Sequence, residues 1–149
     1  MKKLANIDIG LCGEYYVFAQ MHLKGWTASM TLKNYPGIDI LGYNPAENKR
    51  TEIQVKTGQN KYTVLTGLNT DNFIKSIGKI TQPYVFVHLL DDSNIECFIL
   101  TSADFVSLAK SAYSKMNTIT QGKTAPIKFK WADLQQYKNK WNNQYNKQS

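Results

Sequence analysis

The run TEIQVKT, residues 51–57, alternates apolar and polar side chains without a break. Such alternation is typical of a β-strand that buries one face and leaves the other polar. Residues two apart in a strand point the same way, so Glu52, Gln54 and Lys56 share the polar face. The sequence therefore predicts a sheet that carries an acid, an amide and an ammonium in one row.

Hydrophobic periodicity and turn residues predict further elements on both sides of this strand. Helices are expected over residues 12–24, 68–80, 101–116 and 131–145, and strands over 26–32, 38–43, 83–90 and 95–100, with a loop at 117–130. The resulting order is α-β-β-β-α-β-β-α-α. It predicts one α/β domain over residues 1–149, with a mixed sheet flanked by helices.

The net charge of +7 is concentrated near the C-terminus, where residues 122–149 hold six lysines and one acid. A basic segment of this kind is the natural contact for a polyanion, although surface lysines also aid solubility, and charge alone favours that simpler interpretation. Trp131, Leu134, Tyr137, Trp141 and Tyr145 fall near one stripe, and the first four are interpreted as core packing rather than as a base-stacking platform. The candidate nucleic-acid contacts on the opposite face are Lys128, Lys130, Lys138 and Lys140.

Two features of the sequence bear on cellular location. Cys12 and Cys97 lie in apolar stretches and form no CxxC pair, so we expect two buried free thiols in a reducing compartment. The N-terminus lacks the apolar region of a signal peptide, and no apolar run approaches the ~20 residues that span a bilayer. The sequence therefore predicts a cytoplasmic protein without membrane contact.

Asp39 lies in the middle of the apolar run IDILGY, which is predicted to be a strand. If this strand pairs with residues 51–57 as a hairpin, Asp39 lies beside Gln54 and Lys56. Carboxylate and amide oxygens are hard ligands suited to Mg²⁺, and a lysine can position a water or offset phosphate charge. Glu14 adds a third oxygen ligand if the preceding helix crosses this face.

These residues resemble the PD-(D/E)XK nuclease superfamily, which has the restriction-endonuclease-like fold. The likeness rests on Gly13-Glu14 in a first helix, then PGIDIL, then IQVKT, and it covers roughly residues 10–58. It implies metal-dependent cleavage of DNA, with Mg²⁺ as the cofactor and Mn²⁺ as a substitute. By position, Glu14 matches the helix acid and Asp39 the central metal-binding aspartate. Gln54 stands at the second acid position, and Lys56 matches the lysine.

Gln54 is a departure from the usual second acid of this family. Gln-x-Lys is a recurrent variant, but a neutral amide binds a divalent ion less well than a carboxylate does. One alternative is therefore a catalytically degenerate nuclease fold that binds nucleic acid or protein, and another is an interaction protein without a nucleic-acid partner. The sequence does not distinguish DNA from RNA as the substrate. It also leaves open whether the chain forms a homodimer, as many nucleases of this fold do.

Overall fold

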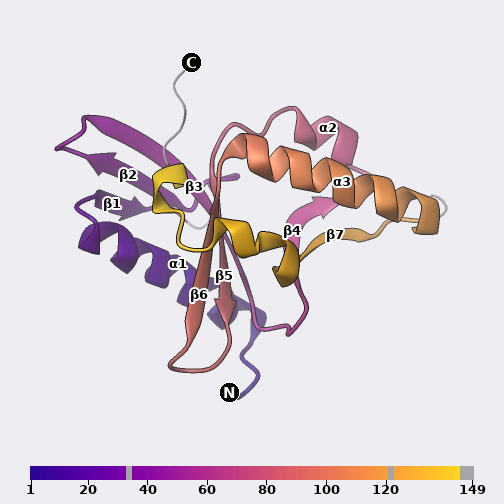
Figure 1. Ribbon diagram of the computed structural model, residues 1–149, viewed down its shortest axis with the longest axis horizontal. Coiled ribbons are helices and arrows are strands. Elements are labelled where there is room, and N and C mark those ends of the chain that lie inside the picture. The colour runs from indigo at the N-terminus through magenta and orange to yellow at the C-terminus, as the bar shows by residue number, and fades with distance from the viewer. Residues whose placement is uncertain (33–34, 121–122, 145–149) are drawn as a thin grey trace.

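The computed structural model describes residues 1–32, 35–120 and 123–144 of the chain (Figure 1). The elements are α1 (Asn6–Leu23), β1 (Thr27–Met30), β2 (Ile40–Asn44), β3 (Lys49–Gly58), β4 (Thr63–Asn69), α2 (Phe73–Ile77), β5 (Tyr84–Leu89), β6 (Ile95–Leu100), α3 (Ser102–Thr120), β7 (Pro126–Lys130), and the 3₁₀ helices η1 (Trp131–Tyr137) and η2 (Trp141–Gln144). A five-stranded mixed sheet has the order β1-β2-β3-β5-β6. A separate two-stranded sheet pairs β4 with β7. The predicted α/β class with a mixed sheet and flanking helices is confirmed.

The long strand β3 changes its partner halfway along. Its first half pairs antiparallel with β2, ending at Ile40 opposite Ile53, and its second half pairs parallel with β5, starting at Gln54 opposite Tyr84. Within the described residues, the β2-side edge of β3 beyond Ile53 therefore has no strand hydrogen-bonded to it. A sheet edge of this kind leaves backbone groups for side chains to satisfy.

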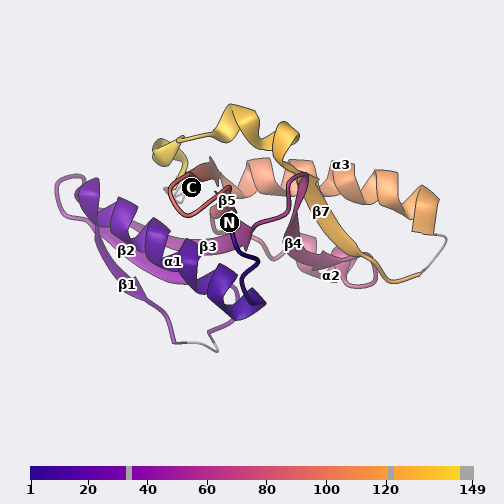
Figure 2. The ribbon, with the colours of Figure 1, turned by 90° about the horizontal axis from the view of Figure 1, so that it is seen from below.

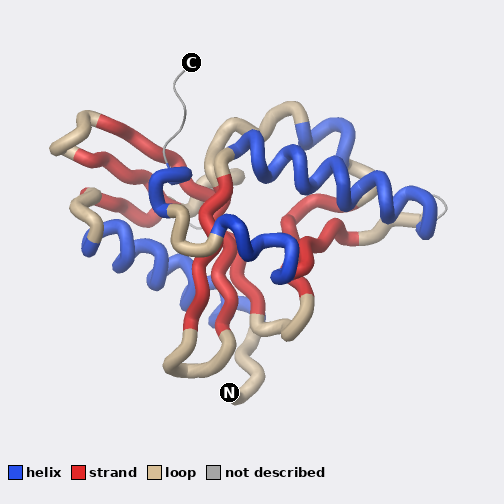
Figure 3. The backbone as a smooth tube through the Cα atoms, viewed as in Figure 1, coloured by secondary structure: helices blue, strands red, loops and turns tan. Residues whose placement is uncertain are grey.

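The two faces of the five-stranded sheet carry separate cores. Val17 and Met21 of α1 pack on one face against Ile53 and other buried residues. On the other face, the ring of Tyr84 stacks on Phe105 of α3, with ring centroids 3.7 Å apart. The β4–β7 sheet and η1 contribute to this second core. Figures 2 and 3 show the β4–β7 sheet standing beside the main sheet and close to α3.

Two predicted helices have different bounds in the structure. The helix expected at 12–24 starts at Asn6, six residues earlier. The helix expected at 68–80 is wrong over most of its length, because only Phe73–Ile77 is helical, Leu68 and Asn69 belong to β4, and residues 70–72 form a turn. The buried residues of β4 alternate and the strand pairs with β7, so tertiary pairing outweighs the local helical pattern.

The expectations for the C-terminal part are also wrong. The predicted loop at 117–130 contains the end of α3 and all of β7. The single helix predicted at 131–145 is two 3₁₀ helices, and position 145 lies outside the described residues. Asn139 lies between them with a φ of 56°, a left-handed backbone conformation that no continuous right-handed helix can contain. Trp131 and Leu134 are buried, as the core-packing interpretation predicts.

The two thiols differ in exposure. Cys97 is buried, as predicted, but Cys12 is exposed, because α1 turns Gly13 rather than Cys12 toward the sheet. In the part of the chain that the structure describes, no helix is long and apolar enough to cross a membrane.

Candidate active site

Asp39 lies just before β2 and is bonded directly to β3. Its N–H donates to the Ile53 carbonyl oxygen at 2.8 Å, and its Oδ2 accepts from the Val55 N–H at 2.7 Å. Extending the β2–β3 register by one residue places Asp39 opposite Gln54. The Asp39 carboxylate therefore stands where β2 leaves the edge of β3, and its second oxygen has no hydrogen bond within the described residues.

The amide of Gln54 links Lys56 to the turn before Asp39. In the orientation that satisfies its hydrogen bonds, the amide oxygen accepts from Lys56 Nζ at 3.2 Å and the amide nitrogen donates to the Gly37 carbonyl oxygen. Gln82 donates to the same carbonyl oxygen at 3.1 Å. Gly37 has a φ of 76°, a conformation that favours glycine in this turn. The side-chain amides of Gln54 and Gln82 thus hold the turn at Gly37, which precedes Asp39.

Gly13 explains how α1 brings Glu14 to the same region. A Cβ atom at position 13 would lie 1.8 Å from Thr57 Oγ1, so this close approach of α1 to β3 requires glycine. Glu14 follows directly and is half-buried. Burial raises the pKa of Glu14, the negative charge of Asp39 raises this pKa further, and Lys56 lowers it. Glu14, Asp39 and Lys56 are therefore close enough to perturb one another.

Lys56 is half-buried, and its environment comes from β4 as well as β3. Burial lowers the pKa of Lys56, against the opposing effect of Asp39 and Glu14. Among the described residues, Lys56 forms no ion pair with either carboxylate. Its ammonium lies against Gly67 of β4, where a Cβ atom would be 3.0 Å from Nζ. Gly67 has a φ of 87°, so glycine is favoured there twice over.

Tyr84 is a neighbour of the site that sequence reasoning missed. It lies opposite Gln54 in the parallel β3–β5 pair and is buried. Burial, with the Asp39 carboxylate as a second cause, raises the pKa of Tyr84 to about 12. The phenol therefore stays protonated near Asp39 at neutral pH. Only the β3–β5 register reveals this neighbour, and no local motif encodes that register.

A pocket of about 760 Å³ opens next to Lys56. Its walls come from the N-terminal segment and the start of α1, from the end of β3, and from Thr63, Leu65 and Gly67 of β4. Asp39, Gln54 and Glu14 do not line it. Of the four candidate site residues, Lys56 is thus the one that lines the pocket.

The four candidate lysines divide into two pairs. Lys128 and Lys130 are exposed on β7, opposite Leu65 and Thr63 of β4. Residues paired in this way have Cβ atoms about 4.5–5.5 Å apart, so both lysines stand at the rim of the pocket. Lys138 instead pairs with Glu96, and Lys140 follows it in the segment after η1.

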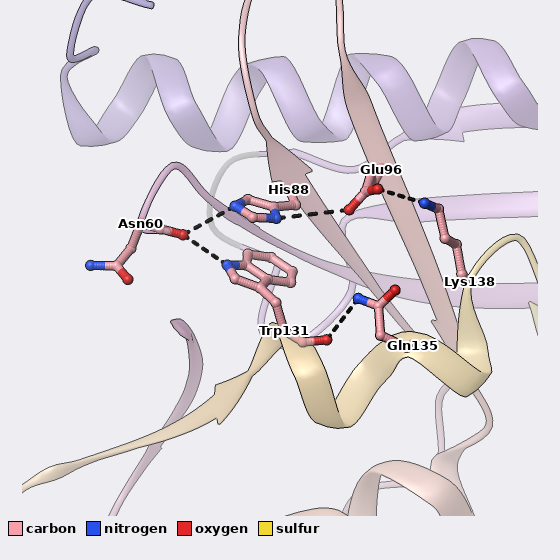
Figure 4. A network of polar contacts seen from close by, with 6 residues as sticks. All are labelled: Asn60, His88, Glu96, Trp131, Gln135 and Lys138. Carbon is pink, nitrogen blue, oxygen red and sulfur yellow. Dashed lines mark hydrogen bonds and ion pairs between the residues drawn. The ribbon is translucent and has the colours of Figure 1, made fainter. Parts of the chain in front are cut away.

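A polar network holds the segment after β3 against β5, β6 and η1 (Figure 4). The carbonyl oxygen of Asn60 accepts from Trp131 Nε1 at 2.8 Å and from His88 Nε2 at 3.1 Å. The His88 ring stacks on Trp131, with centroids 4.0 Å apart, and its Nδ1 is 4.0 Å from Glu96. Asn60 also lines the pocket, so this network supports one pocket wall.

The oxygen atoms around Lys56 suit a hard divalent ion in type and charge. Asp39 and Glu14 supply two negative charges and Lys56 one positive charge, which leaves a net charge that a cation would offset. The free oxygen of Asp39, Glu14 and the Gln54 amide oxygen are the available ligands. No three His, Cys, Asp or Glu side chains gather as ligands in the described residues. A divalent ion bound here would therefore need the Gln54 amide oxygen as its third protein ligand.

Comparison of the chain with protein-family models, with curated proteins and with solved structures finds no match.

Proposed function

We propose that the chain is a metal-dependent nuclease that hydrolyses phosphodiester bonds of DNA. The observation that carries the proposal is the arrangement of Asp39, Gln54 and Lys56 at the edge of β3, with Glu14 of α1 near enough for its pKa to respond to Asp39 and Lys56. A restriction-endonuclease-like fold is the finer description we propose for the mixed sheet with α1 on one face. The resemblance to PD-(D/E)XK nucleases supports both statements through the order and spacing of the same residues.

Each residue has a distinct role in the proposed reaction. Asp39, Glu14 and Gln54 would hold Mg²⁺, or Mn²⁺ in its place, and a bound divalent ion polarises a phosphodiester and lowers the pKa of a bound water. Lys56 supplies an ammonium that orients the attacking water and offsets negative charge on the phosphate. Its half-buried position strengthens both effects because less water screens the charge.

Cleavage of plasmid DNA and of a single-stranded DNA oligonucleotide in the presence of Mg²⁺ or Mn²⁺ tests this proposal. We expect Asp39→Asn and Lys56→Met each to lower the cleavage rate by at least about 100-fold. Glu52→Gln is the matched control, because Glu52 is exposed on β3 and pairs with Leu41 of β2. Wild-type protein that does not cut, or variants that cut equally well, would exclude the nuclease function.

The alternative is a binding module that keeps the fold without catalysis. One observation favours it: Gln54 Oε1 already accepts from Lys56, and Asp39 Oδ2 from Val55, so both are weaker ligands than free carboxylates. Retention of DNA in EDTA, unchanged in Asp39→Asn and without cleavage on metal addition, would favour this function.

A homodimer that cuts both strands is part of the nuclease proposal, and sedimentation of the wild-type protein with DNA tests it.

A further inference from the structure

The pocket beside Lys56 lies along the part of β3 that β2 does not cover. The N-terminal segment forms one of its walls, and Gln59 holds this segment in place. Gln59 Oε1 accepts from the Leu4 N–H at 3.0 Å, and its Nε2 donates to the Lys2 carbonyl oxygen at 3.3 Å. Lys3, between these two residues, lines the pocket. The wall that carries Lys3 is therefore tied to the end of β3.

The charged groups of the pocket favour an anion. Lys3 and Lys56 supply two ammonium groups, and Asn6 and Asn60 add side-chain amides. Among the described residues no carboxylate lines the pocket, although Asp8 and Asp91 are close to lining residues in sequence. A half-buried ammonium that faces such a pocket gains most from an anionic ligand, because little solvent screens the interaction.

The size and the remaining walls describe the rest of the ligand. A volume of about 760 Å³ is far more than a single phosphate fills, and it falls within the ~300–1,000 Å³ of small-molecule sites. Ile9, Leu65 and Leu90 add apolar side chains to the lining. The pocket thus suits a ligand that carries an anionic group and an apolar surface that these side chains can cover. A nucleotide has both parts.

We propose that this pocket binds one nucleotide unit of a nucleic-acid strand. Its phosphate lies at Lys56 and Lys3, and its base lies against Ile9 and Leu65. The inference rests on the proposed function in one respect, because the bound unit neighbours the phosphodiester bond that the site would cut. A stacked and paired base cannot enter a pocket, so the substrate class is a strand that is single or that frays from its complement.

Amide NMR spectra of the full chain in EDTA test this inference without cleavage. We expect thymidine 5′-monophosphate to shift the amides of Gly58, Gly67 and Leu90, and thymidine to bind at least about tenfold more weakly. A 5′-phosphorylated tetrathymidylate should shift the same amides and bind more tightly. Inorganic phosphate that binds as tightly as the nucleotide would overturn the nucleotide assignment. A free nucleotide that binds while the tetranucleotide does not would overturn the assignment to a strand.

Matched variants locate the site. Leu65→Trp fills the pocket from β4 and should weaken the nucleotide about tenfold, whereas Ile74→Trp, at an exposed position of α2 outside the pocket, should leave binding unchanged. Lys3→Gln leaves the core untouched and should weaken nucleotide binding about threefold. This variant replaces Leu65→Trp in the test if Leu65→Trp does not fold. Equal binding by all three variants would overturn the inference. Nucleotide binding without DNA cleavage excludes only the nuclease proposal, and Asp39-dependent cleavage without nucleotide binding excludes only the pocket.

Discussion

Lys56 reaches the candidate site through space that Gly67 leaves open on β4. A Cβ atom at position 67 would lie 3.0 Å from Lys56 Nζ and 3.2 Å from Cε. Because Nζ ends a flexible side chain, we expect Gly67→Ala to displace the ammonium from the Gln54 oxygen rather than unfold the chain. DNA cleavage should fall about tenfold or more, since small misplacements of a reacting group are costly. Mass spectrometry of lysine acylation should show faster labelling of Lys56.

Gly25→Ala is the matched control for backbone strain. Gly25 has a φ of 83°, close to that of Gly67, but a Cβ atom there meets no other atom within 4 Å. Both variants should lose about 1–2 kcal/mol of unfolding free energy in urea, because alanine is strained in the left-handed region. Only Gly67→Ala should change cleavage and Lys56 labelling. Equal effects of the two variants would show that Gly67 does not position Lys56.

The residues of the site differ in how far the sequence could reveal them. Asp39, Gln54 and Lys56 could be predicted to meet, because alternation in β3 and the short connection to β2 fix their faces and register. Gly67 and Tyr84 could not. Their contacts depend on β4 crossing β3 and on the parallel β3–β5 pair, and these arise from tertiary packing of distant segments.

At the scale of elements, the strands of the main sheet were predictable and the β4–β7 sheet was not. The main-sheet strands alternate or are continuously apolar and are separated by turn residues, so local patterns suffice. In β4, Gly67 interrupts the run with its positive φ, and the partner strand β7 lies some sixty residues later, at Leu65 opposite Lys128. Such a strand is stabilised by its distant partner, which a local pattern cannot identify.

The network that joins β5, β6 and η1 predicts how stability depends on pH. Burial lowers the pKa of His88 below its usual 6.5, although the Asn60 hydrogen bond and Glu96 oppose this effect. The unfolded chain then binds the proton more readily than the folded chain, so unfolding free energy should fall as pH drops below about 6.5. Urea unfolding between pH 7.5 and 5.5 measures this change.

Substitution of each of the two histidines of the chain tests whether His88 causes this fall in stability at low pH. His88→Gln should cost about 2 kcal/mol at neutral pH, because the stacked ring is lost, and should flatten the acid decline in stability. His22→Gln changes an exposed residue of α1 and should retain the decline. A wild-type protein with constant stability over this range, or a His88→Gln variant that keeps the decline, would contradict the assignment to His88.

At the scale of the whole molecule, the placement of positive charge predicts which face meets a polyanion. The net charge is +7, and Lys128 and Lys130 stand at the rim of the pocket, whereas Lys138 is paired with Glu96. We expect Lys128→Gln/Lys130→Gln to weaken binding of single-stranded DNA and to reduce the slope of log K against log salt by about 1.4. This figure follows because each lysine that neutralises a phosphate of a single strand contributes about 0.7 to the slope.

Lys138→Gln/Lys140→Gln removes the same charge elsewhere and is the matched control for that measurement. Its slope should change by less than half as much, because Lys138 is engaged with Glu96 and, unlike Lys128 and Lys130, neither residue is paired with a strand residue that lines the pocket. Fluorescence anisotropy of a labelled oligonucleotide over a salt series gives both slopes. Equal slopes for the two double variants would mean that binding follows net charge alone. A larger effect at Lys138 and Lys140 would move the interface to the C-terminal segment and away from the pocket.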